Sequence, residues 1–249
     1  MIRVFFLFLL CTNVYGQIDT SKISISTKQY YEFDYGPPEC DIDYDSVIND
    51  VKAISYPIVK TPDETLNKVL NNNIRKISGV HELKGSFEKT VGIHACEDYL
   101  SEYNLTYILN FKNSRYLSFT FSTDWYSGGG GSGVTHGQVA LTFDMANSKT
   151  LLLKDIIIEQ YDTEVYNISI SQLKKVVPAL FGEYGESSNP QLFDFTSTLN
   201  FPIAIKKEGV VIYWNLSWGA RSAAEEVIIR FDKYSHIFNR NFLKAVKRE

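Results

Sequence analysis

The stretch that most constrains the fold runs from residue 116 to residue 153. In residues 116–124 apolar side chains alternate with serine and threonine, and a second alternating run follows at 138–144. A glycine-rich segment, residues 127–137, separates the two runs. Alternation with a period of two, interrupted by glycine, is typical of antiparallel strands. The sequence therefore predicts a central hairpin, with a further short strand at 150–153.

The same patterns predict the remaining elements and the fold class. Thr61 is the expected N-cap of the clearest helix, and Gly79 is expected to end it. No internal repeat or linker interrupts the chain, and strand–helix–strand units are scarce. We expect an α+β fold in which residues 17–249 form a single domain of antiparallel β-sheet meanders, with a few helices packed on one face. Further strands are expected at 22–35, 51–59, 104–111, 199–205, 210–216 and 226–231, and helices at 66–77, 86–99, 168–181 and 234–247.

The composition indicates a folded protein that does not bind nucleic acid. Hydrophobic residues make up 44% of the 249 residues and aromatic residues 14%, which excludes a disordered chain. The formal net charge is -4, whereas a nucleic-acid binder usually carries a basic face. The basic residues are scattered apart from Lys244, Lys247 and Arg248, which we interpret as the solvated end of a C-terminal helix.

Residues 1–16 have the pattern of a secretory signal peptide. Arg3 precedes a short apolar run, and Val14 and Gly16 provide small residues before the expected cleavage site. No later apolar run approaches the roughly 20 residues that span a bilayer. We expect an exported protein, periplasmic or secreted, that starts at Gln17 and has no transmembrane segment. An alternative is lipidation of Cys11, which would make the protein an envelope lipoprotein.

The cysteines and histidines bear on disulfide and metal binding. Cys40 and Cys96 would remain after cleavage, and an even pair in an oxidising compartment predicts a disulfide, with two free thiols as the alternative. The glycine-rich segment lacks the lysine and hydroxyl residue that end a phosphate-binding loop. Zinc-site spacing is absent from the four histidines, so we expect neither a metal nor a cofactor. These histidines are His81, His94, His136 and His236.

Residues from about 50 to 238 resemble a known family of exported domains. The hallmark is Tyr126-Ser127-Gly128-Gly129 followed closely by His136. The chain resembles the extracytoplasmic domain of lysozyme-sensing anti-sigma factors and the accessory domain of bacterial peptidoglycan deacetylases. It departs from that pattern by an insertion before His136, and no sigma-binding or deacetylase segment is evident. Other positions that carry the resemblance are Phe143, Asp144, Lys149, Leu151, Leu153, Asp155, Gly209, Val211, Tyr213, Ala223, Ala224, Val227, Ile229 and Tyr234.

The expected function is non-catalytic binding in the bacterial cell envelope. Exposed aromatic side chains beside a glycine-rich segment can stack on a sugar or on a partner's side chain, although they can also simply cover a sheet edge. The resemblance implies a lysozyme-like protein or a cell-wall glycan as ligand. One alternative is a cell-wall glycan hydrolase that uses paired carboxylates, and another is a structural envelope lipoprotein. The expected ligand-binding residues are Trp125, Tyr126, Gly128, Gly129, His136 and Trp218.

Overall fold

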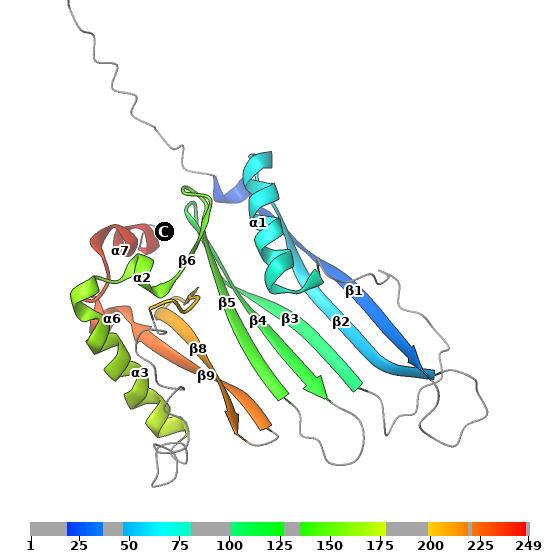
Figure 1. Ribbon diagram of the computed structural model, residues 1–249. Helices are drawn as coiled ribbons and strands as arrows, with labels where there is room; N and C mark the ends of the chain where they lie inside the picture. The colour runs from blue at the N-terminus through cyan, green and yellow to red at the C-terminus, as the bar shows by residue number, and fades with distance from the viewer. Residues whose placement is uncertain are drawn as a thin grey trace, which may run out of the picture.

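The chain folds into a mixed sheet with helices on it, and most neighbouring strands are antiparallel, which confirms the predicted α+β class (Figure 1). The computed structural model describes residues 19–36, 47–80, 101–126, 135–177, 199–218 and 221–247. The strands are β1 (Ser24–Gly36), β2 (Val47–Lys60), β3 (Ser101–Lys112), β4 (Tyr116–Tyr126), β5 (Thr135–Asp144), β6 (Lys149–Leu151), β7 (Ala204–Ile205), β8 (Gly209–Trp218) and β9 (Arg221–Arg230). The helices are α1 (Glu64–Ile77), α2 (Leu153–Ile156), α3 (Asp162–Val176), α6 (Phe231–Tyr234) and α7 (Arg240–Val246).

Several predictions lie outside the described residues. These are the signal peptide and Cys11, the proposed pair Cys40 and Cys96, and the helix expected at 86–99. They stay predictions.

The strands follow the order β1-β2-β3-β4-β5-β9-β8-β7, and β6 pairs with the end of β5. The predicted hairpin of β4 and β5 lies at the centre, and β3 pairs with β4 as expected. The connection from β2 to β3 contains α1, and these two strands are parallel. Among the described residues a single backbone pair, Thr135 and Ser222, joins β5 to β9, so β7–β9 form a second part that backbone pairing connects to the first at one point.

Strand β4 is buried on both faces, which its sequence pattern does not indicate. Leu117, Phe119 and Phe121 pack in one core with α1, whose buried residues are Leu66, Leu70 and Ile74. The alternate residues Ser118 and Thr120 are 0% and 3% exposed, although their hydroxyl groups predict a solvent-facing side. Strands β7 and β8 cover them, and the hydroxyl groups are hydrogen-bonded to these strands and to β5.

A chain of hydrogen bonds crosses this interface. The amide of Ile205 donates to Oγ of Ser118 (2.8 Å), and Oγ1 of Thr142 donates to the carbonyl of Ile203 (2.6 Å). Ser118 and Thr142 are 2.9 Å apart. Since the one hydroxyl proton of Thr142 goes to Ile203, Ser118 must donate to Thr142. Every hydroxyl in the relay is therefore satisfied, which offsets the cost of burying it.

The helices divide between two cores. Figure 1 shows α1 over the β2 side of the sheet, while α3, α6 and α7 gather beside β8 and β9. The amide of Gln172 in α3 bonds both the N–H and the C=O of Ile228, which fixes α3 to β9. The second core includes Val165, Ile168, Leu173, Val210, Ile212, Trp214, Val227, Ile229, Phe238, Phe242 and Val246.

Three predicted helix boundaries are wrong. Helix α3 spans Asp162–Val176 and not 168–181. Asp63, not Thr61, caps α1, because its carboxylate accepts from the amides of Thr65 and Leu66, whereas the Thr61 hydroxyl accepts from the Asp63 amide. The closing helix expected at 234–247 is two short helices, α6 and α7. The bridge from Ile157 to Phe238 and the burial of Phe238 hold the chain between them in an extended form.

The relay predicts the effect of removing a buried hydroxyl. Thr142→Val keeps the shape of the side chain but leaves the Ile203 carbonyl and the Ser118 hydroxyl without their partner. We expect the free energy of unfolding to fall by about 1–3 kcal/mol, measured by urea denaturation. Thr150→Val is the control, because Thr150 is half-buried and its hydroxyl makes no hydrogen bond to the described residues. Equal effects of the two substitutions would contradict a stabilising role for the relay.

Candidate functional site

The predicted binding residues that the structure describes lie at one end of the sheet, where β4 ends and β5 begins. Trp125 and Tyr126 are 46% and 38% exposed. His136 lies opposite Asp124 on the neighbouring strand. Trp218 ends β8, and its side chain is outside the description, as are Gly128 and Gly129 entirely. The pairing of Thr135 with Ser222 brings the end of the β8–β9 hairpin beside the start of β5.

The structure does not place all these side chains on one face. Neighbouring residues of a strand point to opposite sides of the sheet. Asp124, Tyr126 and His136 therefore share one face, while Trp125 lies on the other, in register with Tyr103. A ligand that touches both Trp125 and His136 has to reach around the end of the hairpin.

A short polar contact links the two strands at this end. Nδ1 of His136 lies 2.6 Å from Oδ1 of Asp124, and both side chains are about half exposed. The contact fixes the orientation of the imidazole ring, because the carboxylate engages one of its two nitrogens. The pair therefore presents an oriented ring and a carboxylate, both able to hydrogen-bond a ligand.

The backbone beside this pair is held closely. The side-chain amide of Asn215 in β8 bonds both the N–H and the C=O of Gln138 in β5, at 2.9 and 3.0 Å. A Cβ atom at Gly137 would lie 2.6 Å from Oγ1 of Thr123, so a larger residue would force that side chain to move. The backbone next to His136 is therefore held by Asn215 of β8 on one side and packed against Thr123 of β4 on the other.

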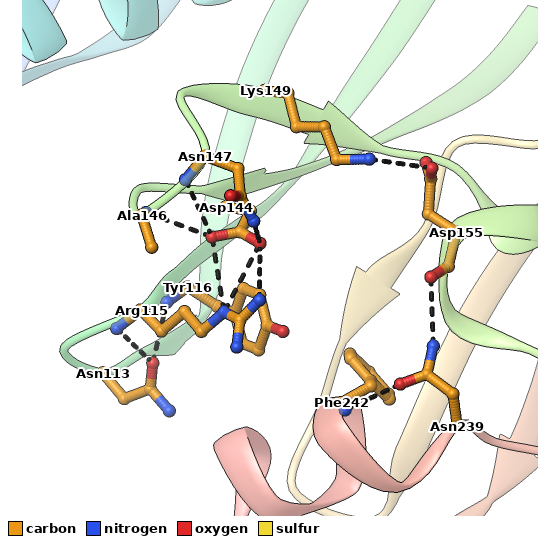
Figure 2. A network of polar contacts seen from close by, with 10 residues as sticks. All are labelled: Asn113, Arg115, Tyr116, Asp144, Ala146, Asn147, Lys149, Asp155, Asn239 and Phe242. Atoms are coloured by element: carbon orange, nitrogen blue, oxygen red, sulfur yellow. Dashed lines mark hydrogen bonds and ion pairs between the residues drawn. The ribbon is translucent and has the colours of Figure 1, made fainter. Parts of the chain in front are cut away.

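A second candidate site lies at the opposite end of the hairpin, and sequence reasoning missed it. It is a pocket of about 330 Å³ between the β3–β4 turn, the β5–β6 turn and the start of α7 (Figure 2). The sequence singles out Asp144, Lys149 and Asp155 only through the family resemblance. The other lining residues carry no local motif, because they come from two distant parts of the sequence, Arg115 with Tyr116 and Asn239 with Arg240.

Asp144 holds the wall of this pocket together. It is 2% exposed, and Nη2 of Arg115 lies 3.1 Å from its carboxylate. The amide of Ala146 and the side chain of Asn147 also donate to it, at 3.1 and 2.7 Å. Burial lowers the pKa of Arg115, but the hydrogen bond and charge of Asp144 outweigh it and raise that pKa. Asp144 is thus a structural group that orders the β5–β6 turn.

Asp155 plays a similar part at the start of α2. Its carboxylate accepts from the amide of Leu152 (2.8 Å) and from Nζ of Lys149 (2.9 Å). Burial raises the pKa of Asp155, but these two donors outweigh burial and lower it below its usual value. Asn239 links α2 to α7. Its side chain donates to the Asp155 carbonyl and accepts from the Phe242 amide, and the second bond caps α7.

Tyr116 is the aromatic residue at the base of the pocket. Its side chain is buried, its ring packs against Phe242 with centroids 5.7 Å apart, and the Arg115 guanidinium lies 5.2 Å from the ring centroid. Burial raises the pKa of Tyr116 to about 12; the Arg115 charge lowers it and the Asp144 charge raises it. The phenol is therefore protonated at neutral pH and can donate a hydrogen bond.

Across the described ranges, no group of three or more histidine, cysteine, aspartate and glutamate residues is arranged to hold a metal ion. In the same part of the chain, no helix has the length and apolar character needed to cross a membrane.

Two solved structures of DUF3298 family proteins are similar in fold. One, from Bacteroides fragilis, has a TM-score of 0.54 and 13% identity, covering 92% of this chain and 99% of that one. The other, from Pseudomonas aeruginosa, has a TM-score of 0.54 and 14% identity, covering 91% and 98%. No known family model and no curated protein matches the sequence. The structural neighbours thus share the fold over nearly the whole chain, and the finer resemblance to anti-sigma factors and deacetylases stays a prediction.

The role of Asp144 can be tested by removing its charge. Asp144→Asn replaces one carboxylate oxygen with an amino group. That amino group would face Arg115, Ala146 or Asn147, which are themselves donors. We expect the free energy of unfolding to fall by about 2–4 kcal/mol in urea denaturation. Asp232→Asn, which removes the exposed pair with Arg230, is the control and should leave stability unchanged. Comparable losses in both variants would show that burial of Asp144 does not matter.

The raised pKa of Tyr116 predicts a pH dependence of stability. The folded protein keeps the phenol proton to about pH 12, whereas the unfolded chain loses it near the ordinary value of 10.0. The folded state then binds more protons in this window, so the free energy of unfolding falls as pH rises, by up to about 2–3 kcal/mol from this group. Tyr116→Phe should lose less stability between these pH values than the original protein. Parallel curves would contradict the assignment.

Proposed function

We propose that this protein is an exported, non-catalytic binding domain of the bacterial cell envelope. Its ligand is a protein similar to lysozyme or a cell-wall glycan, held at the end of β4 and β5. The observation that carries the proposal is the exposure of two adjacent aromatic side chains, Trp125 and Tyr126, beside the oriented pair of Asp124 and His136.

These groups suit a sugar or a protein side chain on physical grounds. An indole or phenol ring stacks on the apolar face of a sugar, or on a partner's apolar side chain, and gains by removing that surface from water. Asp124 and His136 add directional hydrogen bonds, which hydroxyl and amide groups of either ligand can satisfy. Since Tyr126 and Trp125 lie on opposite faces of the sheet, a ligand that binds both would contact the hairpin end on both faces.

The proposed location follows from the N-terminal sequence. Residues 1–16 have the charged start, apolar middle and small-residue cleavage site of a signal peptide. Export fits a ligand outside the cytoplasm and a disulfide between Cys40 and Cys96. Mass spectrometry of the mature N-terminus separates a start at Gln17 from a lipidated Cys11.

Binding is tested by co-sedimentation with purified peptidoglycan, with soluble lysozyme added in a parallel tube. We expect either pelleting with the wall or retention of lysozyme in solution. Combined Trp125→Ala and His136→Ala substitutions should weaken that binding at least about tenfold, because central aromatic contacts dominate such interfaces. His236→Ala is the matched control, since His236 is also an exposed histidine paired with a carboxylate, Glu164, but lies outside this site.

Two outcomes would overturn the proposal. Unchanged binding of the double variant would remove the hairpin end as the contact surface. Release of soluble sugar fragments from the wall would favour the alternative of a glycan hydrolase.

A further inference from the structure

We propose that the pocket between the β5–β6 turn and α7 is a second binding site, which takes a small ligand through an oxyanion group, a carboxylate or a phosphate. The proposal does not rest on the function proposed for the other end of the hairpin. Strand β4 runs from Tyr116 to Tyr126, and ten residues of extended chain separate the two ends by about 33 Å.

The first observation is an unpartnered hydroxyl group. Tyr116 is 2% exposed, yet its hydroxyl makes no hydrogen bond to the described residues. The hydroxyl oxygen of Tyr116 is still accessible to solvent, and Tyr116 lines the pocket. Figure 2 shows the hydroxyl directed into the space in front of Asn239 and Phe242. A buried polar group is costly unless it has a partner, so water or a ligand has to supply one here.

The second observation is an excess of donors. The two carboxylates of the lining, Asp144 and Asp155, are already engaged by protein donors. Arg115 uses Nε and Nη2 for Asp144, and its Nη1 donates to no described residue. Arg240 is exposed at the rim and forms no ion pair within the described ranges. Among the charged groups of the lining, those left for a ligand are therefore the cationic donors Arg115 and Arg240.

The arrangement favours an oxyanion over a neutral molecule. The Arg115 guanidinium lies over the Tyr116 ring, so Nη1 and the phenol hydroxyl belong to adjacent groups. Charge-assisted hydrogen bonds to carboxylate or phosphate oxygens are about twice as strong as bonds between neutral groups. A volume of about 330 Å³ is at the small end of ligand sites, which suits a molecule of a few heavy atoms to about sugar size.

The packing around the pocket supports a preformed site. The Asp144 and Asp155 networks fix Arg115 and Lys149, and Asn239 fixes the start of α7. A ligand would meet side chains that are already ordered, so little conformational entropy is lost on binding.

The test is a titration of the protein at neutral pH by NMR, with inorganic phosphate, acetate and lactate as probes and N-acetylglucosamine as a neutral comparison. We expect saturable shifts of the Tyr116, Asn147 and Phe242 amides with phosphate or with the carboxylates. Whichever anion binds tighter identifies the source of the oxyanion. Saturation by the neutral sugar alone would overturn the proposal, as would the absence of saturable shifts with every anion.

Variants make the test specific. Tyr116→Phe removes only a hydroxyl that has no partner among the described residues, so the fold should persist while anion affinity falls about tenfold or more. Arg240→Gln, at the exposed rim, should weaken binding by about threefold. Tyr107→Phe is the control, because it removes a tyrosine hydroxyl that bonds Thr27 far from the pocket. Anion binding that Tyr116→Phe leaves unchanged would refute the site.

Discussion

The burial of β4 on both faces is the constraint on which the rest of the structure depends. One face carries large apolar residues that pack under α1, and the other carries serine and threonine that face β7 and β8. A hydroxyl face can be buried only where each group finds a partner, and the relay through Ser118 and Thr142 supplies one for each. Because β5 and β9 share a single backbone pair, this relay is a main attachment between the two parts of the sheet.

The same layering makes the two ends of the hairpin different. At the Tyr116 end, α7 and the β5–β6 turn close over the strands and leave a small, ordered pocket. At the Tyr126 end, the exposed fraction rises along the last residues of β4, and aromatic side chains face outward. A partly enclosed pocket can select a ligand by size and charge, whereas an open end offers area to a large partner. The two proposed sites follow from this difference.

Sequence reasoning succeeded where local periodicity decides the structure. The strands around the central hairpin and helix α1 follow from apolar spacing, because each carries a buried face of regularly spaced apolar residues. It could not separate Ser118 from a solvent-facing serine, since the partner at Ile205 is 87 residues away. It also placed the α1 cap at Thr61, because Pro62 and Glu64 complete a capping pattern there, whereas Asp63 makes the cap in the structure. The pocket was missed for the same reason as the relay: Arg115, Asp144 and Asn239 meet only in the folded chain.

Two carboxylates on the central hairpin, Asp144 and Asp124, differ in burial, and this difference distinguishes a structural group from a group able to bind a ligand. Asp144 is 2% exposed and surrounded by donors from Arg115, Ala146 and Asn147, so no acceptor capacity is left for a ligand. Asp124 is about half exposed and, among the described residues, has one short contact, to His136, so it keeps acceptor capacity facing water. By this criterion, a binding group is one whose hydrogen-bonding capacity exceeds what the protein supplies. The Tyr116 hydroxyl meets it inside the fold, as Asp124 does at the surface.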